Sequence, residues 1–279
     1  MQPDFIVIGA MKCGTSTVCA YLEDHPDIFM VPGCEPNFFS HDENFARGPE
    51  WYERFFAGQD GARLRGEGSN AYASGQMFPH SATRMAAYKP DLKLIYVVRH
   101  PVDRIVSAWI QNRVNMGDKI PPTLDRAVRD MPERYLGQSL YWQNLSRYRA
   151  LFPDSRIHVA FMEDLKSDRD AFFAGICGFL GMAPAPRIRR DHVNPSTGKT
   201  MPSRRYSAVN GLPMVKRLKS LLPPRLRHGV RDRFLTQRIT GGNQPEFGPA
   251  TRDWLRAQLA PDSAAFLDHC GRPGDYWRF

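Results

Sequence analysis

The stretch that decides the fold is DFIVIGAMKCGTSTVCAYL, residues 4–22. Its first part, residues 5–8, is a continuous apolar run, which is typical of a strand buried in a parallel sheet. The segment that follows is bounded by Gly9 and Gly14 and leads directly into a helical pattern. Amides at such a junction converge on an anion, because the start of a helix carries a partial positive charge. We therefore predict an anion-binding loop between this strand and this helix.

A lysine and a group of hydroxyls strengthen this interpretation. Lys12 lies inside the loop, and Thr15, Ser16 and Thr17 follow Gly14. Each of these side chains offers a donor where the helix dipole already favours negative charge. In the Walker pattern of P-loop proteins the lysine comes after the second glycine, so this loop resembles a P-loop with a displaced lysine. A strand, loop and helix with incidental glycines is the alternative.

A second segment combines a strand pattern with an arginine. The apolar run 94–98 is β-prone, and RHPVDRIVSAW, residues 99–109, follows it. Pro101 suits the first turn of a helix, which places Arg99 at the end of the strand and Ser107 on the helix. Ligands of open α/β sheets bind beyond that edge, and an arginine with a hydroxyl suits a phosphate monoester. The alternative is that Arg99 pairs with Asp103, and the residues alone leave both interpretations open.

Taken together, the two segments resemble the paired motifs of sulfotransferases that use 3′-phosphoadenosine 5′-phosphosulfate (PAPS). The first is similar to the loop that binds the 5′-phosphosulfate, and the second is similar to the element that binds the 3′-phosphate. Further stretches look like the bacterial and glycan-modifying branches of this family: EPNFF at 35–39, GEGS at 66–69, FMEDL at 161–165 and ICGFLG at 176–181. The resemblance covers most of the chain, from residue 4 to Trp277.

The resemblance implies a fold, a reaction and a set of residues. The expected fold is a P-loop-like, three-layer α/β fold with a central parallel sheet and helices on both faces, in a single domain 1–279. The expected reaction moves the sulfuryl group of PAPS to an alcohol hydroxyl of a small-molecule, lipid or carbohydrate acceptor by in-line displacement, with PAP as product and no metal. Lys12 is expected to neutralise the leaving oxygen. The residues expected to bind PAPS are Lys12, Cys13, Gly14, Thr15, Ser16, Thr17, Arg99, Ser107, Lys199 and Arg204.

The general base is expected to be Glu35. This residue matches the glutamate that acts as base in the glycan-modifying members, and partial burial beside Phe38 and Phe39 is expected to raise its pKa. His41 is the rival, since imidazole is the commonest base near neutral pH. A surface glutamate without a catalytic role is the remaining alternative.

Several positions depart from the family pattern on the acceptor side. Cys34 and Gly68 stand where many relatives have lysines, and Ser40 replaces an aspartate. These departures leave the identity of the acceptor open. Glu67 is expected to support Lys12 or its loop from behind.

Composition agrees with one α/β enzyme. The chain has 279 residues, of which 42% are hydrophobic, which suffices for a single large core. Strands and helices alternate, as expected for a parallel sheet covered on both faces. The segment 184–213, rich in proline and basic residues, is too long for an ordinary connection and is predicted to be a substrate or cofactor loop. Strands are expected at 4–9, 28–31, 64–67, 94–98 and 157–162, and helices at 15–24, 78–88, 101–115, 139–151, 168–180 and 249–267.

Charge and cysteine content limit the classes of function. The formal net charge of +9 favours an anionic ligand, and much of the excess lies between residues 187 and 238. No nucleic-acid module accompanies these basic residues, so binding of nucleic acid is not expected. Five scattered cysteines favour neither a disulfide framework nor a zinc site. Without a recognisable signal peptide or an apolar run long enough to span a membrane, a cytoplasmic location is expected, and the oligomeric state stays open.

Two rival functions remain at this stage. A P-loop small-molecule kinase would use the same loop, but it would need magnesium and a lysine after Gly14, where this chain has Thr15. A non-catalytic polyanion-binding protein would depend steeply on salt and would not need Lys12.

Overall fold

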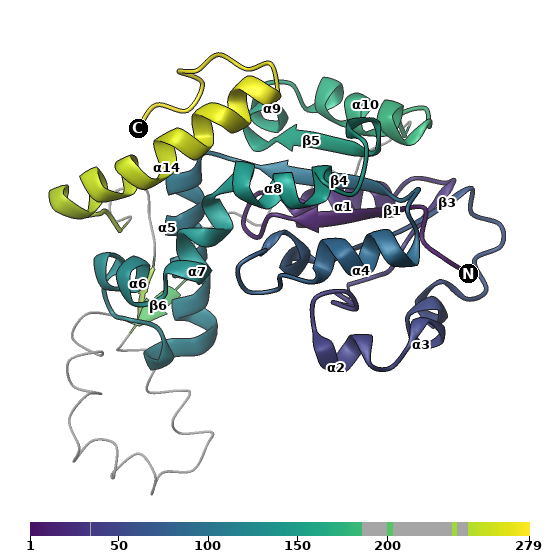
Figure 1. The fold of residues 1–279 in the computed structure, drawn as a ribbon, viewed down its shortest axis with the longest axis horizontal. Helices are drawn as coiled ribbons and strands as arrows, with labels where there is room; N and C mark the ends of the chain where they lie inside the picture. Colours follow the sequence, from purple (N-terminus) through teal and green to yellow (C-terminus); the bar gives the residue numbers. More distant parts are fainter. Residues whose placement is uncertain (34, 186–199, 203–235, 239–244) are drawn as a thin grey trace, which may run out of the picture.

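The computed structural model describes residues 1–33, 35–185, 200–202, 236–238 and 245–279. Its centre is a five-stranded sheet in the order β2-β3-β1-β4-β5, in which every neighbouring pair is parallel. Figure 1 shows the strands crossing the middle of the molecule. They are β1 (Phe5–Gly9), β2 (Ile28–Met30), β3 (Leu64–Gly68), β4 (Lys93–Val98) and β5 (Ile157–Phe161).

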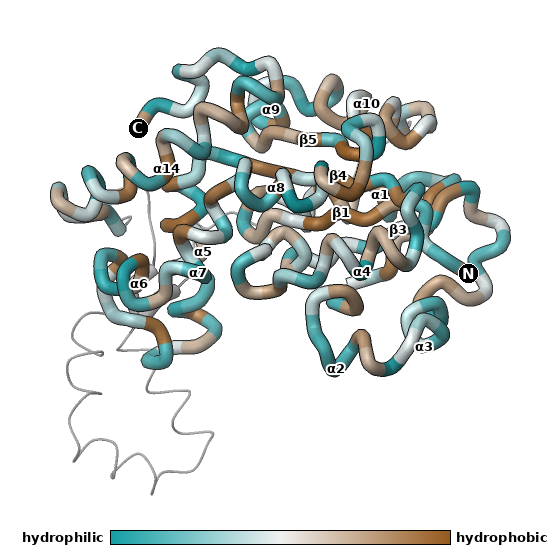
Figure 2. The backbone as a smooth tube through the Cα atoms, in the orientation of Figure 1, coloured by the Kyte–Doolittle hydropathy of each residue, from teal (hydrophilic) through white to brown (hydrophobic). Residues whose placement is uncertain are grey.

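The strand β1 forms the middle of the sheet. All five of its residues are buried, and it pairs with β3 on one side and β4 on the other. Figure 2 shows the hydrophobic colour gathered along β1 and β4. Gly66 of β3 lies opposite Phe5, and a Cβ at this glycine would lie 2.3 Å from the Phe5 ring. The glycine in β3 therefore makes room for an aromatic ring of the neighbouring strand.

Helices cover both faces of the sheet, as Figure 1 shows. On one face lie α1 (Thr15–Glu23) and α10 (Arg169–Leu180), whose Tyr21 and Phe173 rings stack at 3.8 Å. On the other lie α8 (Tyr141–Arg149) and α14 (Pro249–His269), which hold Tyr141 and Phe266 against the Tyr96 ring of β4. The helix α4 (Ser81–Tyr88) lies on the side of α8. The predicted three-layer fold is confirmed.

A second, smaller core adjoins the sheet. The helix α5 (Pro101–Met116) extends beyond β4 and packs against α6 (Leu124–Asp130), α7 (Pro132–Tyr135) and the first half of α14. Arg104 of α5 is fully buried here and donates to the Ser139 hydroxyl and the Tyr135 carbonyl, both at 2.6 Å. The other elements are α2 (Asp42–Phe45), α3 (Pro49–Glu53), α9 (Met162–Ser167) and the short strands β6 (Thr200–Pro202) and β7 (Thr236–Arg238).

The predicted elements agree closely with the structure. Each of the five predicted strands and six predicted helices is present, with ends within three residues of the expected positions. Of the predicted loop 184–213, residues 186–199 and 203–213 lie outside the described residues, while 200–202 form β6 and pair antiparallel with β7. The division into domains stays a prediction. In the described part of the chain, no helix combines the length and apolar character needed to cross a bilayer.

Candidate active site

The two predicted motifs meet at the carboxyl edge of the sheet. From β1 the chain runs through α1 to β2 at one side of the sheet, whereas from β4 it runs through α5 toward β5 at the other. The ends of β1 and β4 are therefore a topological switch point, where open α/β sheets bind ligands. The guanidinium Nη1 of Arg99 donates to the carbonyl oxygen of Lys12 at 3.4 Å. The arginine after β4 thus touches the loop after β1.

The loop leaves the start of α1 open. Lys12 and Gly14 adopt φ angles of +72° and +94°, in the left-handed region that L side chains rarely occupy. Gly14 is the residue before α1, and as a glycine it has no side chain that could cap this helix. A Cβ at Gly14 would lie 2.6 Å from Sδ of Met162, so a larger residue would need the neighbouring side chain to move. The uncapped helix end offers amide donors and a favourable dipole to an anion.

Lysine and hydroxyl groups surround this helix end. Nζ of Lys12 donates to Oε1 of Gln111 on α5 at 3.4 Å. Thr15 donates its hydroxyl to Oδ1 of Asn70 at 2.8 Å. Ser16 is exposed, whereas Thr17 is buried. The loop, α5 and the end of β3 are thereby linked around one point.

Cys13 faces the core instead of the outer surface of the loop. Its Sγ lies 3.5 Å from the Tyr141 hydroxyl oxygen, and burial raises the pKa of its thiol to about 11. Its amide donates to the carbonyl oxygen of Ala10 at 3.1 Å. Both the thiol and the amide of Cys13 thus have partners within the protein, and the expectation that Cys13 binds PAPS stays a prediction.

Arg99 shows the alternative pairing as well as the contact with the loop. Its Nη2 donates to Oδ2 of Asp103 at 3.1 Å, in an ion pair whose carboxylate is exposed. Among the described residues its Nε is buried and has no hydrogen-bond partner, so one donor of this guanidinium is unsatisfied. Ser107 is buried on α5. Lys199 and Arg204 lie outside the described residues.

Glu35 is joined to the loop through Asn70. The Asn70 amide nitrogen donates to Oε1 of Glu35 at 2.5 Å, while its oxygen accepts from Thr15. The expected burial of Glu35 is wrong: its side chain is exposed, while Phe38 and Phe39 are fully buried among other aromatic rings. The phenylalanines anchor the segment and leave the carboxylate outside the core.

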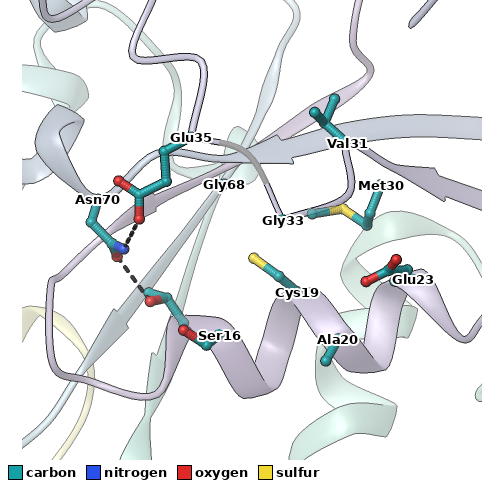
Figure 3. Close-up of a pocket in the computed structure, with 11 residues that line it drawn as sticks. Ser16, Cys19, Ala20, Glu23, Met30, Val31, Gly33, Glu35, Gly68 and Asn70 are labelled. Carbon is teal, nitrogen blue, oxygen red and sulfur yellow. Dashed lines mark hydrogen bonds between the residues drawn. The ribbon is translucent and has the colours of Figure 1, made fainter. Parts of the chain in front are cut away.

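A pocket of about 230 Å³ lies between α1 and the chain that follows β2. Figure 3 shows Glu35 and Asn70 at one end, with a dashed line marking their hydrogen bond. The pocket is lined by Thr15, Ser16, Cys19, Ala20, Glu23, Met30, Val31, Gly33, Glu35, Gly68 and Asn70. The exposed carboxylate of Glu35 therefore faces a space that an acceptor can enter.

His41, the rival base, lies elsewhere. Its Nδ1 is 2.9 Å from the Ser40 hydroxyl oxygen, and its ring lies 4.7 Å from the Phe78 ring. It does not line the pocket. Of the two candidate bases, Glu35 lines this pocket and His41 does not, and the choice between them stays a prediction.

Glu67 is linked to the segment that carries Glu35. Its buried carboxylate accepts hydrogen bonds from the hydroxyls of Tyr52 at 3.1 Å and Ser69 at 2.7 Å. Burial raises its pKa to about 7, although these hydrogen bonds act in the opposite direction. The Ser69 oxygen in turn accepts from the Asn37 amide at 3.0 Å. These contacts lead to the residues beside Glu35, and the expected support of Lys12 or its loop stays a prediction.

Asn70 was not predicted from the sequence. The one signal that points to it is its position just beyond the carboxyl end of β3, at the same sheet edge as the loop. In the described ranges, no cluster of three or more histidine, cysteine or acidic residues has a geometry suited to a metal ion.

Comparison with known proteins settles the family. The family model described as "Sulfotransferase domain" matches residues 2–220. The chain belongs to the sulfotransferase family. The predicted family and enzyme class, a PAPS-dependent sulfotransferase, are thereby confirmed.

Curated relatives of this sulfotransferase include two human enzymes. One is bifunctional heparan sulfate N-deacetylase/N-sulfotransferase 2, 27% identical over 200 residues, covering 65% of this chain and 22% of the relative. Another is heparan sulfate glucosamine 3-O-sulfotransferase 6, 28% identical over 202 residues, covering 70% of this chain and 57% of the relative. The chain thus spans between about a fifth and just over half of the relatives' lengths.

Solved structures support the same assignment. A sulfotransferase from Alicyclobacillus acidocaldarius superposes with a TM-score of 0.69 and 25% identity, and the match covers 100% of both chains. The mouse sulfotransferase SULT7A1 complexed with PAP gives a TM-score of 0.54 at 15% identity, covering 96% of this chain and 86% of the other. This second likeness concerns the fold alone.

Proposed function

We propose that this protein transfers the sulfuryl group of PAPS to a hydroxyl of an acceptor in the pocket beside Glu35. The observation that carries the proposal is the chain of contacts from Thr15 of the anion-binding loop through Asn70 to Glu35. It joins the loop that would hold the donor to a carboxylate that faces an open pocket. Two hydrogen bonds therefore connect the loop expected to bind the donor with the carboxylate beside the acceptor, and a group transfer needs both sites close together.

The residues of the loop fit PAPS. The start of α1 has no side-chain cap, and Arg99 has a buried, unpartnered Nε beside the same loop. When bound, PAPS supplies an activated sulfuryl group on a phosphate leaving group. The amides and hydroxyls from Gly14 to Thr17 would hold the phosphosulfate, and Arg99 with Ser107 would hold the 3′-phosphate.

The chemical step divides between two side chains. Lys12 neutralises the charge that develops on the leaving oxygen, and Glu35 accepts the proton of the attacking hydroxyl. Asn70 holds the Glu35 carboxylate in place while this proton moves. No step requires a metal ion, since the lysine and the loop amides carry the stabilising positive charge.

The proposal includes several classes of acceptor. The two human relatives carry heparan sulfate in their names, which supports a carbohydrate hydroxyl as one acceptor. Small-molecule and lipid alcohols remain within the proposal, whereas nucleic acid does not. A cytoplasmic location also stays a prediction.

The test compares donors and ligands with the whole protein. We expect calorimetry to show binding of PAP, and we expect turnover of PAPS, not of ATP, when EDTA is present. Lys12→Ala should weaken both PAP binding and turnover. ATP turnover that requires magnesium would favour the kinase alternative. Binding of polyanions that is indifferent to Lys12→Ala would favour the non-catalytic alternative.

A further inference from the structure

The pocket beside Glu35 is elongated along α1. Four of its lining residues, Ser16, Cys19, Ala20 and Glu23, have the spacing that places side chains on one face of a helix. The first and the last are seven positions apart, which is about 10 Å along a helix axis. Figure 3 shows Glu35 and Asn70 at one end, with Glu23 and Met30 toward the other.

The charge of this pocket has one sign. Carboxylates lie at both ends, Glu35 and Glu23, and among the residues that the structure describes the lining includes no lysine, arginine or histidine. Among the described residues, neither carboxylate forms a salt bridge with a basic side chain. Between the two ends the lining is mostly apolar or small, with Cys19, Ala20, Met30, Val31 and Gly33.

The pKa of the Cys19 thiol reflects the negative charge of these carboxylates. Burial raises the pKa of its thiol to about 12, and the negative charges of Glu67, Glu35 and Glu23 act in the same direction. A thiolate in the middle of the pocket is thus disfavoured by three carboxylates. An anionic group of an acceptor meets the same opposition there.

We propose that this pocket selects a hydroxyl acceptor that carries a cationic group about two helical turns from the reacting hydroxyl, and that it disfavours anionic acceptors. This inference rests on the proposed function and names the acceptor class of that same site. The hydroxyl lies beside Glu35, an apolar body lies against Met30 and Val31, and the cation lies beside Glu23. Polyanions such as heparan sulfate, which the relatives' names specify, have the opposite charge.

The test uses three matched acceptors with the full chain and PAPS. They are linear eight-carbon primary alcohols whose far end carries a trimethylammonium group, a methyl ether or a carboxylate. A quaternary ammonium cannot itself accept a sulfuryl group, so only the hydroxyl reacts. We expect kcat/KM to fall in that order, by roughly three- to ten-fold between the first and the last, as for exposed charge pairs.

Two variants assign the preference to the pocket. Glu23→Gln should bring the three values of kcat/KM together, and Glu23→Lys should reverse their order. Glu50→Gln, which removes an exposed glutamate of α3 outside the pocket, should leave the order unchanged. Binding of PAP, measured by calorimetry, should be the same in all of these proteins.

Three outcomes would overturn the inference. The first is a preference for the carboxylate alcohol. The second is an absence of any difference among the three alcohols, including a failure to use any of them. The third is a cation preference that survives Glu23→Gln. If PAP binds and PAPS is turned over with another hydroxyl acceptor in these cases, the proposed function stands and only the acceptor class is wrong. If PAP does not bind, or if PAPS is not turned over with any hydroxyl acceptor, the proposed function itself fails.

Discussion

Asn70 and Glu35 are the residues on which the proposed chemistry depends most directly. One asparagine amide contacts the base through its nitrogen and the anion-binding loop through its oxygen. Because an asparagine amide donates on one side and accepts on the other, this single residue fixes the orientation of both partners.

Glu35→Gln keeps the size of the side chain and removes its ability to accept a proton. We expect kcat to fall by about 10² to 10⁴, the usual contribution of a general base, while the PAP dissociation constant changes little. Steady-state kinetics and calorimetry measure the two quantities. Equal losses of rate and PAP affinity would indicate a structural role, and a larger loss of rate in His41→Ala would move the base to His41.

Asn70→Ala removes a hydrogen bond to a carboxylate, which is worth about 1.5–3 kcal/mol. We expect kcat to fall by about ten-fold or more, with PAP affinity nearly retained, since the loop itself is intact. Asn70→Asp places a second carboxylate beside Glu35 and should move the acidic limb of the pH–rate profile to higher pH. An unchanged pH profile in Asn70→Asp would mean that Asn70 does not position the base.

Glu67 links stability to pH. Its pKa is raised from 4.5 to about 7 by burial, so folding favours its protonated form. The stabilisation is complete below about pH 4.5 and is lost as the pH rises through 7, by about 3 kcal/mol in total. Urea denaturation between pH 5 and 8 should therefore show a smaller pH dependence for Glu67→Gln than for the parent. The exposed-site control Glu50→Gln should keep the parent's pH dependence; a parallel fall in both variants would contradict this account.

At the scale of elements, the site depends on how closely α1 approaches β3. A Cβ at Gly68 of β3 would lie 2.6 Å from Sγ of Cys19 on α1. Any larger side chain at this position must displace Cys19. This contact gives a physical reason why the strand carries glycine where the family resemblance led us to expect lysine.

Gly68→Ala should therefore lower the free energy of unfolding by about 1–3 kcal/mol, as other overpacked contacts do. Cys19→Ala in the same chain should recover most of this loss, because it removes the atom in conflict. A double-mutant cycle by urea denaturation measures the coupling between the two sites. Additive effects would show that the helix and strand do not meet at these residues.

At the scale of the molecule, the net charge of the chain is positive, whereas the charged side chains that line the pocket along α1 are negative. The chain carries +9 overall, whereas the pocket along α1 is lined by carboxylates. A positive molecule attracts the anionic donor over long distances, and salt screens that attraction.

We expect the affinity for PAP, measured by calorimetry, to fall steadily as the ionic strength is raised from about 50 to 500 mM. The KM of the neutral ether alcohol should change little over the same range, because no long-range charge guides it. A PAP affinity that does not depend on salt would mean that short-range contacts alone hold the nucleotide.

The sequence predicted the sheet and both motifs because each depends on local patterns. Apolar runs followed by glycine or proline mark β1 and β4, and their parallel pairing brings Arg99 to the Lys12 loop. The directions in which individual side chains point were harder to predict. Cys13 lies in the binding motif but points into the core, and Glu35 lies beside two core phenylalanines but points outward. Side-chain direction in irregular segments depends on distant partners such as Tyr141 and Asn70, which short motifs do not contain.

The direction of the hydrogen bond between Thr15 and Asn70 has a kinetic consequence. The threonine proton points to Asn70, so Thr15 can donate to a phosphosulfate oxygen only by giving up this bond. Asn70 keeps its hydrogen bond to the Glu35 carboxylate, which accepts the proton of the incoming alcohol. Binding of the nucleotide therefore changes the contacts of the residue that holds the base, and initial-velocity studies combined with product inhibition by PAP should show an ordered addition in which the nucleotide is first.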